Sequence, residues 1–249
     1  MPQIDYNYYI YVGYAFILAV KIKIFMITLT EVLVTIILFI WVAFVVTILT
    51  KKVYKLLVSR GNEHKIAVYY NRKIIHMLAG GVAAIVVPFV FSTPILPLIF
   101  AAILAAFIYV PHRTGKLMGW FQVCENCYEV SFAVMWGAVL SLGWFFSGGN
   151  FWFGVVPALF MAFGDAITGV VRNLIYKRRT KSWYGNLAMA SISIPTGAIL
   201  GPVGVLSGAI ASIIEHFEFG IIDDNITVPA VTLALLLTVN YFVPGFLAF

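Results

Sequence analysis

Long apolar runs separated by short polar segments are the feature that most restricts how this chain of 249 residues can fold. Hydrophobic residues make up 62% of the sequence and charged residues only 10%, against roughly 25% charged in soluble domains. So few charges leave most of the surface to be covered by lipid, where the backbone must satisfy its hydrogen bonds within helices. The sequence therefore predicts an all-α fold, a polytopic integral membrane helical bundle.

Runs of about 20 apolar residues can each cross a bilayer as a helix. We expect spans near residues 24–49, 74–91, 94–110, 128–147, 151–172, 186–200, 203–217 and 227–248. A Tyr-rich run at 6–20 would add one more span, so the predicted count is eight or nine, and the side of the N-terminus stays open. We divide the chain into residues 1–65, with N-terminal membrane helices and a basic loop, and residues 66–249, the catalytic part.

Basic residues are concentrated in alternate connections between these spans, which predicts the orientation in the membrane. The connections that carry them contain Lys51, Lys52, Lys55, Arg60, Lys65, Arg72 and Lys73; His112, Arg113 and Lys116; and Arg172, Lys177, Arg178, Arg179 and Lys181. The connections near residues 92–94, 147–150 and 201–202 are uncharged. The basic side is therefore predicted to be cytoplasmic. The net charge of +6 then reflects topology, anionic lipid or a phosphate-rich substrate, and we expect no nucleic-acid partner.

The same order of spans places the unusual polar residues at one membrane face. His76, Asp165 and Glu215 fall at cytoplasmic span ends, and Asp223 and Asp224 lie in a cytoplasmic connection. Random placement would divide such residues between the two sides. We therefore expect one active site at the cytoplasmic membrane surface, with these five residues as catalytic candidates.

Residues 164–186 combine a carboxylate, small residues and cations. Asp165 lies near the end of an apolar span, where an unpaired carboxylate is costly. Asp165, Gly169 and Arg172 share one helical face at spacings i, i+4 and i+7. Hard oxygen ligands beside cations are what a magnesium–phosphate site requires. The basic cluster that follows is equally typical of a segment that only sets topology.

Two other segments carry similar chemistry. In RKIIHML, Arg72, Lys73 and His76 can share a helical face, and the two cations favour contact of the histidine with an anionic ligand over a purely structural role. In IIEHFEFGIIDDNITVPAV, the adjacent Asp223 and Asp224 lie just before the last span. Adjacent carboxylates favour binding of a divalent cation, although one residue could simply cap the last helix.

Other polar residues give weaker signals. Cys124 and Cys127 form a lone C-x-x-C, which we interpret as two small residues near the membrane surface, because no second pair or H-x-x-H completes a zinc site. Glu125 and Glu129 belong either to the site or to the interface, and Glu31 either to helix packing or to function. P-loop, soluble-kinase and hydrolase motifs are absent from the sequence.

Taken in chain order, R-K-x-x-H, then G-D-x-x-x-x-G with a following K-S-x-x-G-N, then E-x-x-x-x-x-x-x-D-D-N-x-x-x-P resemble the dolichol kinase and phytol kinase family of polyprenol kinases. The resemblance covers residues 72–229. It implies a polytopic enzyme that uses CTP or a related nucleoside triphosphate to phosphorylate a membrane isoprenoid alcohol such as geranylgeraniol, phytol or dolichol. The Tyr-Lys-Arg-Arg run after Arg172 departs from the glycine-containing turn that members of the family often have.

The resemblance also implies site residues. The nucleotide-binding segment of the family maps to Gly164, Asp165, Gly169, Lys181, Ser182 and Gly185, and its acidic motif to Glu215, Asp223, Asp224 and Asn225. On this reading Asp165, Asp223 and Asp224 would hold Mg²⁺, and His76 or Glu215 would accept the hydroxyl proton. The remaining phosphate-binding candidates are Arg72, Lys73, Arg172, Lys177 and Asn186.

Two alternatives remain. A related cytidylyltransferase, which makes CDP-activated lipids, would share the G-D segment and basic loop, but its K-D segment and P-G-H-G-G-x-x-D-R-x-D ending are absent from this sequence. A membrane transporter would place charge along a path and often in repeated halves, whereas here the charge gathers at one face.

Overall fold

The computed structural model describes residues 27–177, 180–217 and 222–243, and these residues form helices and connections without a β-strand. The all-α prediction is therefore confirmed for the described part of the chain. The run at 6–20, Arg178, Arg179 and the end of the last predicted span lie outside it. The helices are α2 (Leu29–Phe44), η1 (Val45–Leu49), α3 (Thr50–Ser59), α4 (His64–Ile75), η2 (His76–Gly81), α5 (Val82–Val90), α6 (Ile95–Thr114), α7 (Tyr128–Phe146), α8 (Trp152–Leu159), η3 (Phe160–Gly164), α9 (Asp165–Tyr176), α10 (Trp183–Gly197), η4 (Ala198–Leu200), α11 (Gly201–Ile214) and α12 (Asp224–Phe242).

Many of these helices join end to end. Within the described residues, seven helical segments are long and apolar enough to cross a membrane, by length and composition. They are Leu29–Ser59, His64–Val90, Ile95–Thr114, Tyr128–Phe146, Trp152–Tyr176, Trp183–Ile214 and Asp224–Phe242. The chain thus has the character of a multi-pass membrane protein, and the predicted count of eight or nine spans stays a prediction.

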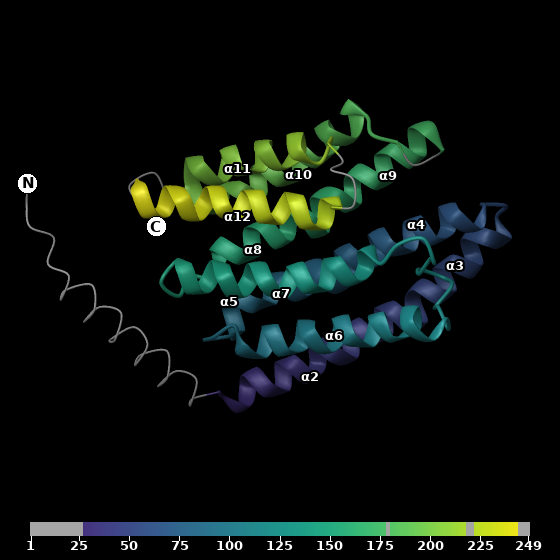
Figure 1. Ribbon diagram of the computed structural model, residues 1–249, viewed down its shortest axis with the longest axis horizontal. Coiled ribbons are helices and arrows are strands. Elements are labelled where there is room, and N and C mark those ends of the chain that lie inside the picture. The colour runs from purple at the N-terminus through teal and green to yellow at the C-terminus, as the bar shows by residue number, and fades with distance from the viewer. Residues whose placement is uncertain (1–26, 178–179, 218–221, 244–249) are drawn as a thin grey trace, which may run out of the picture.

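The segment Trp183–Ile214 is a helical hairpin, because the chain reverses at Gly201, whose φ is +68°. The antiparallel helices α10 and α11 lie side by side (Figure 1). Gly197 meets the backbone of Gly204, and Gly208 meets the backbone of Ser193, so neither contact leaves room for a side chain. Each helix is about 22 Å long, shorter than a hydrocarbon core of about 30 Å. The hairpin corresponds to the two short spans predicted at 186–200 and 203–217.

The basic segment 51–73 is helical, which corrects the prediction of a loop there. Helix α3 continues the first span and α4 begins the second, with only residues 60–63 between them. Val53 and Leu57, four residues apart, are half-buried, whereas Lys51, Lys52 and Lys55 are exposed. An apolar face at helical spacing explains why the helices continue past the apolar runs.

The basic connections lie at one end of the bundle, the right-hand end of Figure 1. Contacts between distant segments confirm this arrangement: Arg72 reaches Asn126, and Arg172 reaches Glu215. Trp152–Tyr176 is the most enclosed segment, with 78% of its most apolar stretch buried. Asp165 therefore lies on the central helix of the bundle.

Glu31 lies at the opposite end and binds α2 to the connection after α5. Its carboxylate accepts hydrogen bonds from the backbone N–H of Thr28 (2.7 Å) and from the N–H and hydroxyl of Ser92 (2.6 and 2.8 Å). The Thr28 hydroxyl accepts from the Glu31 N–H in return, which completes a capping box. Of the two roles left open for Glu31, the structure supports helix packing.

Glu31→Ala is expected to destabilise the protein by about 2 kcal/mol, because it removes the acceptor of the hydrogen bonds from Thr28 and Ser92 and with it the capping box of α2. Thermal unfolding in detergent measures the effect. Glu63→Ala is the matched control, since Glu63 is exposed and makes no cap hydrogen bond. Equal unfolding temperatures for the two variants would contradict the role assigned to Glu31.

Candidate functional site

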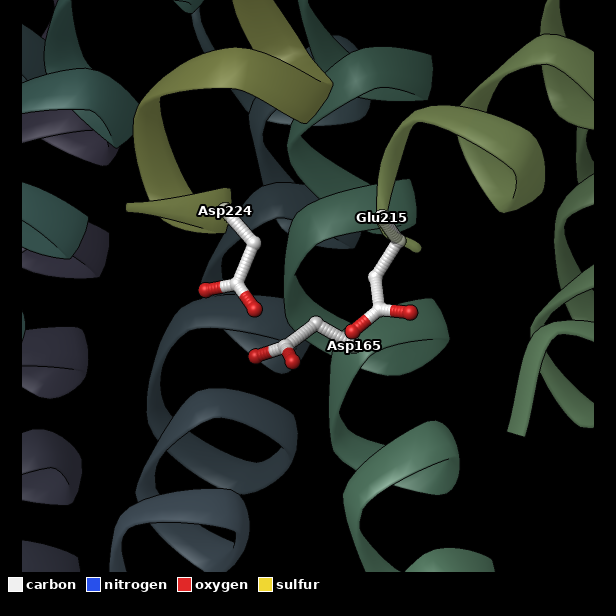
Figure 2. A group of neighbouring side chains, drawn as sticks. All are labelled: Asp165, Glu215 and Asp224. Carbon is white, nitrogen blue, oxygen red and sulfur yellow. The ribbon is translucent and has the colours of Figure 1, made fainter. Parts of the chain in front are cut away.

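Three carboxylates converge at the basic end of the bundle. Asp165 begins α9, Glu215 follows α11 and Asp224 begins α12. Figure 2 shows the three side chains pointing toward one another, and one oxygen from each lies within 4.8 Å of the others. Asp165 and Glu215 are buried and Asp224 is partly exposed. We call these residues the carboxylate cluster.

Asp165 is paired with Lys73 and His76. Lys73 Nζ lies 2.7 Å from both carboxylate oxygens of Asp165, and His76 Nδ1 lies 3.2 Å from Oδ2. Asp165 is only 3% exposed and Lys73 8%. A charge at such depth requires a partner, and each of these residues supplies it to the other.

Glu215 is held by two cations. The guanidinium of Arg172 makes a bidentate pair with its carboxylate at 2.7 Å for each contact, and Lys181 Nζ lies 2.8 Å from Oε1. Glu215 is 1% exposed. Bidentate Arg–carboxylate pairs fix both partners in one plane, so Glu215 has a defined orientation.

Lys181 connects the two sides of the cluster. Its Nζ also contacts Asp224 Oδ2 at 3.2 Å. Burial by itself lowers the pKa of Lys181, but attraction to Asp224 and Glu215 outweighs burial and raises it above the usual value. Lys181 therefore stays an ammonium ion, and the site consists of carboxylates interleaved with the cations Lys73, Arg172 and Lys181.

Two π-helical turns adjoin the site. Turn η2 begins at His76, and η3 ends at Gly164, directly before Asp165. The two turns contact each other, with Gly81 against the ring of Phe163. Such turns are rare and occur frequently at functional sites.

The glycines predicted to bind nucleotide lie against neighbouring side chains. A Cβ atom at Gly169 would strike Tyr69 and Lys73, one at Gly185 would strike Arg172, and one at Gly164 would meet Ser193. These positions were predicted to bind nucleotide. In the structure, neighbouring side chains occupy the space beside these glycines. They include Lys73 and Arg172, two of the cations that pair with the carboxylate cluster.

Gly185→Ala is expected to destabilise the protein by about 2 kcal/mol, although alanine favours helices over glycine. The added methyl group would occupy the place of Arg172 Nε. Thermal unfolding in detergent tests this expectation, with Gly119→Ala as control, because a Cβ there meets nothing within 4 Å. A Gly185→Ala protein as stable as the wild type would show that Arg172 can move aside.

Asp223, predicted to bind metal, is not one of the three residues of the carboxylate cluster. Its Oδ2 accepts hydrogen bonds from the hydroxyl of Ser131 (2.6 Å) and the amide of Asn225 (3.0 Å), and Asn225 also donates to Tyr128 O (3.1 Å). Burial raises the pKa of Asp223, although the two donors partly offset this effect. Asp223 and Asn225 therefore join α12 to α7, and Glu215 takes the third place in the cluster.

Other predicted residues lie around the cluster. Arg72 contacts Asn126 (3.1 Å) and lies 4.0 Å from Glu129, so it faces α7. Ser182 uses its carbonyl to accept from Arg172 (3.2 Å), and Asn186 Oδ1 accepts from the same guanidinium (3.0 Å). Lys177 is exposed at the end of α9. The structure therefore brings Lys73, Arg172, Lys181 and Asn186 to the cluster, and leaves Arg72 and Lys177 apart.

The thiols of Cys124 and Cys127 are both free and exposed, and no disulfide joins them. This placement agrees with their interpretation as surface residues.

Two side chains at the site were not predicted. His216 stacks on Trp183 at 4.2 Å between ring centroids and makes a 2.9 Å hydrogen bond to Asn186. Tyr69 places its ring 5.2 Å from Lys73 Nζ. Tyr69 and Lys73 are four residues apart on one helix, and this spacing could have predicted their contact. The contacts of His216 with Trp183 and Asn186 form only because the hairpin brings α10 beside the end of α11.

A scan against protein-family models found no match, and searches of curated proteins and of solved structures found none either.

Proposed function

We propose that this chain is a membrane-embedded kinase. It transfers the γ-phosphoryl group of a nucleoside triphosphate, with CTP as the first candidate, to the hydroxyl of an isoprenoid alcohol. The observation that carries the proposal is the interleaving of Asp165, Glu215 and Asp224 with three cations at one end of the bundle. Phosphoryl transfer needs mainly positioning and neutralisation of charge, which carboxylates with a metal ion and nearby cations provide. The order of motifs shared with polyprenol kinases supports the nature of the acceptor.

The donor set of the cluster fits magnesium. Mg²⁺ prefers oxygen ligands and is commonly bound by a few carboxylates together with substrate phosphates. Asp165, Glu215 and Asp224 would hold the ion, which would supply charge neutralisation at the phosphates. In the structure, the negative charge of each carboxylate is paired with an ammonium or guanidinium group. Lys73, Arg172 and Lys181 would turn from carboxylate to phosphate oxygens when nucleotide binds.

The transfer is a displacement at the γ-phosphorus. The alcohol oxygen forms a bond to the γ-phosphorus, and the bond from that phosphorus to the β–γ bridging oxygen breaks, so the nucleoside diphosphate leaves. The hydroxyl proton passes to His76 Nε2. Asp165 accepts at His76 Nδ1, which holds the ring in the tautomer whose Nε2 carries a lone pair. Because the transition state of phosphoryl transfer is largely dissociative, the His76 imidazole needs only modest basicity.

The proposal includes the orientation. Because lysine and arginine favour cytoplasmic connections, the basic end would face the cytoplasm, where nucleotides are available. The membrane would be the cell membrane in a prokaryote and an endoplasmic-reticulum-type membrane in a eukaryote. Whether the bundle has eight or nine spans depends on residues 6–20.

The proposal is tested with purified protein in nanodiscs, Mg²⁺, γ-labelled CTP, ATP or UTP, and geranylgeraniol, phytol or dolichol. Labelled lipid monophosphate that disappears with EDTA is the expected product. If no nucleotide and alcohol pair gives that product, the kinase proposal is wrong. Release of pyrophosphate with formation of a CDP-lipid from a lipid phosphate would instead support a cytidylyltransferase, and solute flux without either product would support a transporter.

A further inference from the structure

An apolar cavity adjoins the carboxylate cluster inside the bundle. About 70 Å³ of it can be occupied by water-sized groups, and it is partly open. Val46 of η1, Ala83 of α5, Leu104 of α6 and Trp136 of α7 are among the residues that line it. Roughly 10–15 Å³ of such space holds one water-sized group, so the cavity accommodates a hydroxyl-bearing end and a few carbon atoms. The cavity is therefore large enough for the leading part of a hydrocarbon chain.

His76 lies between this cavity and the carboxylate cluster. Its Nδ1 faces Asp165 at 3.2 Å, and its ring stacks on Phe132 at 4.0 Å between centroids. Both rings line the cavity. His76 is 3% exposed, and its Nε2 has no hydrogen-bond partner among the described residues. A buried polar atom without a hydrogen-bond partner is uncommon, so we expect a bound group to supply that partner.

The tautomer of His76 defines that partner. The Asp165 carboxylate can only accept, so Nδ1 carries the hydrogen and Nε2 of the neutral ring is an acceptor. Glu129, the other titratable residue of the lining, is also an acceptor, and its Oε1 lies 2.6 Å from His112 Nε2. Among the described residues, no lysine or arginine lines the cavity. These groups fit a ligand that donates a hydrogen bond, and they disfavour an anionic head group.

We infer that the cavity is the acceptor site, in which an uncharged alcohol donates its hydroxyl to His76 Nε2 and places its apolar tail between η1, α5, α6 and α7. The inference rests on the proposed function and adds to it the position and head-group chemistry of the acceptor. The volume admits only the first part of a long isoprenoid, so the rest of such a chain lies in the bilayer. A lipid phosphate, the acceptor of a cytidylyltransferase, would meet Glu129 and no cation in the cavity.

A photoaffinity experiment tests this inference without depending on turnover. The probe is a geranylgeraniol analogue with a diazirine in its tail, added to the full-length protein in nanodiscs without nucleotide, and labelled peptides are identified by mass spectrometry. We expect labels on the cavity faces of α5, α6 and α7 that excess geranylgeraniol removes and excess geranylgeranyl phosphate does not. Ala133→Phe should fill the cavity and reduce these labels about tenfold.

Val134→Phe is the matched control, because Val134 is the next residue of α7, is 52% exposed and lies outside the cavity lining. It should leave the labels unchanged. In the kinase assay, Ala133→Phe should raise the KM for geranylgeraniol and leave the KM for CTP unaltered. Wild-type labels confined to lipid-facing residues such as Val134, and insensitive to competitor, would overturn the inference even if Ala133→Phe fails to fold. Competed cavity labels in a protein without phosphoryl transfer would contradict the proposed function and leave the alcohol site standing.

Discussion

Asp165→Asn is expected to lower kcat for phosphoryl transfer by on the order of 1,000-fold. The substitution removes one of the two buried carboxylates of the cluster, and with it the group that orients His76. It also leaves Lys73 as a buried charge without its partner, which costs about 3–5 kcal/mol of stability. Activity and unfolding temperature are measured on the same preparation.

A double variant separates the chemical loss from the structural one. Lys73→Gln combined with Asp165→Asn replaces the buried ion pair with two amides, which can hydrogen-bond to each other. Replacement of a whole buried pair is far less costly than removal of one partner. We therefore expect the double variant to regain most of the stability and none of the activity. A double variant with activity near the wild type would show that Asp165 serves only to neutralise Lys73.

Asp224→Asn and Asp223→Asn are expected to differ strongly, although each removes one negative charge from neighbouring positions. Asp224 belongs to the carboxylate cluster and contacts Lys181, whereas Asp223 accepts from Ser131 and Asn225. Loss of the Asp224 charge should lower kcat on the order of 100-fold and raise the Mg²⁺ concentration needed for half-maximal rate. An asparagine at 223 keeps an oxygen acceptor for Ser131, so the rate should stay within about tenfold.

The pair of variants is its own control, because both carry the same change of charge at the start of α12. The rate is measured across a Mg²⁺ titration for each. A larger loss for Asp223→Asn than for Asp224→Asn would mean that the metal site lies on the α7 side of the last helix. Equal losses would mean that only the net charge of the pair matters.

Much of the site could be predicted because helical spacing holds within one helix. Asp165, Gly169 and Arg172 were expected on one face of a helix, and all three are buried on α9. Lys73 and His76 were expected to share a face, and both contact Asp165. The order of spans also brought Glu215 and Asp224 to the same end as the basic residues, because consecutive helices alternate in direction.

The partner of each side chain could not be predicted. Arg172 was expected to bind phosphate and is paired with Glu215, and Gly185, expected to approach a nucleotide, makes room for Arg172. A π-helical turn such as η2 or η3 changes the rotation of the helix beyond it, so spacing no longer predicts facing across the turn. The hairpin at Gly201 brings Asn186 beside His216, and no local pattern indicates that contact.

A helical bundle of multi-pass membrane character, with most of its ionisable residues at one end, follows from the amino-acid sequence, because lipid requires apolar helices and charge is tolerated only near their ends. Only helix packing brings Glu215 and Asp224 together with Asp165 in the cluster, while Asp223 accepts a hydrogen bond from Ser131. It also decided that His76 faces an apolar cavity. These outcomes depend on helix rotation and packing, which place the buried carboxylates of Asp165 and Glu215 against their cations.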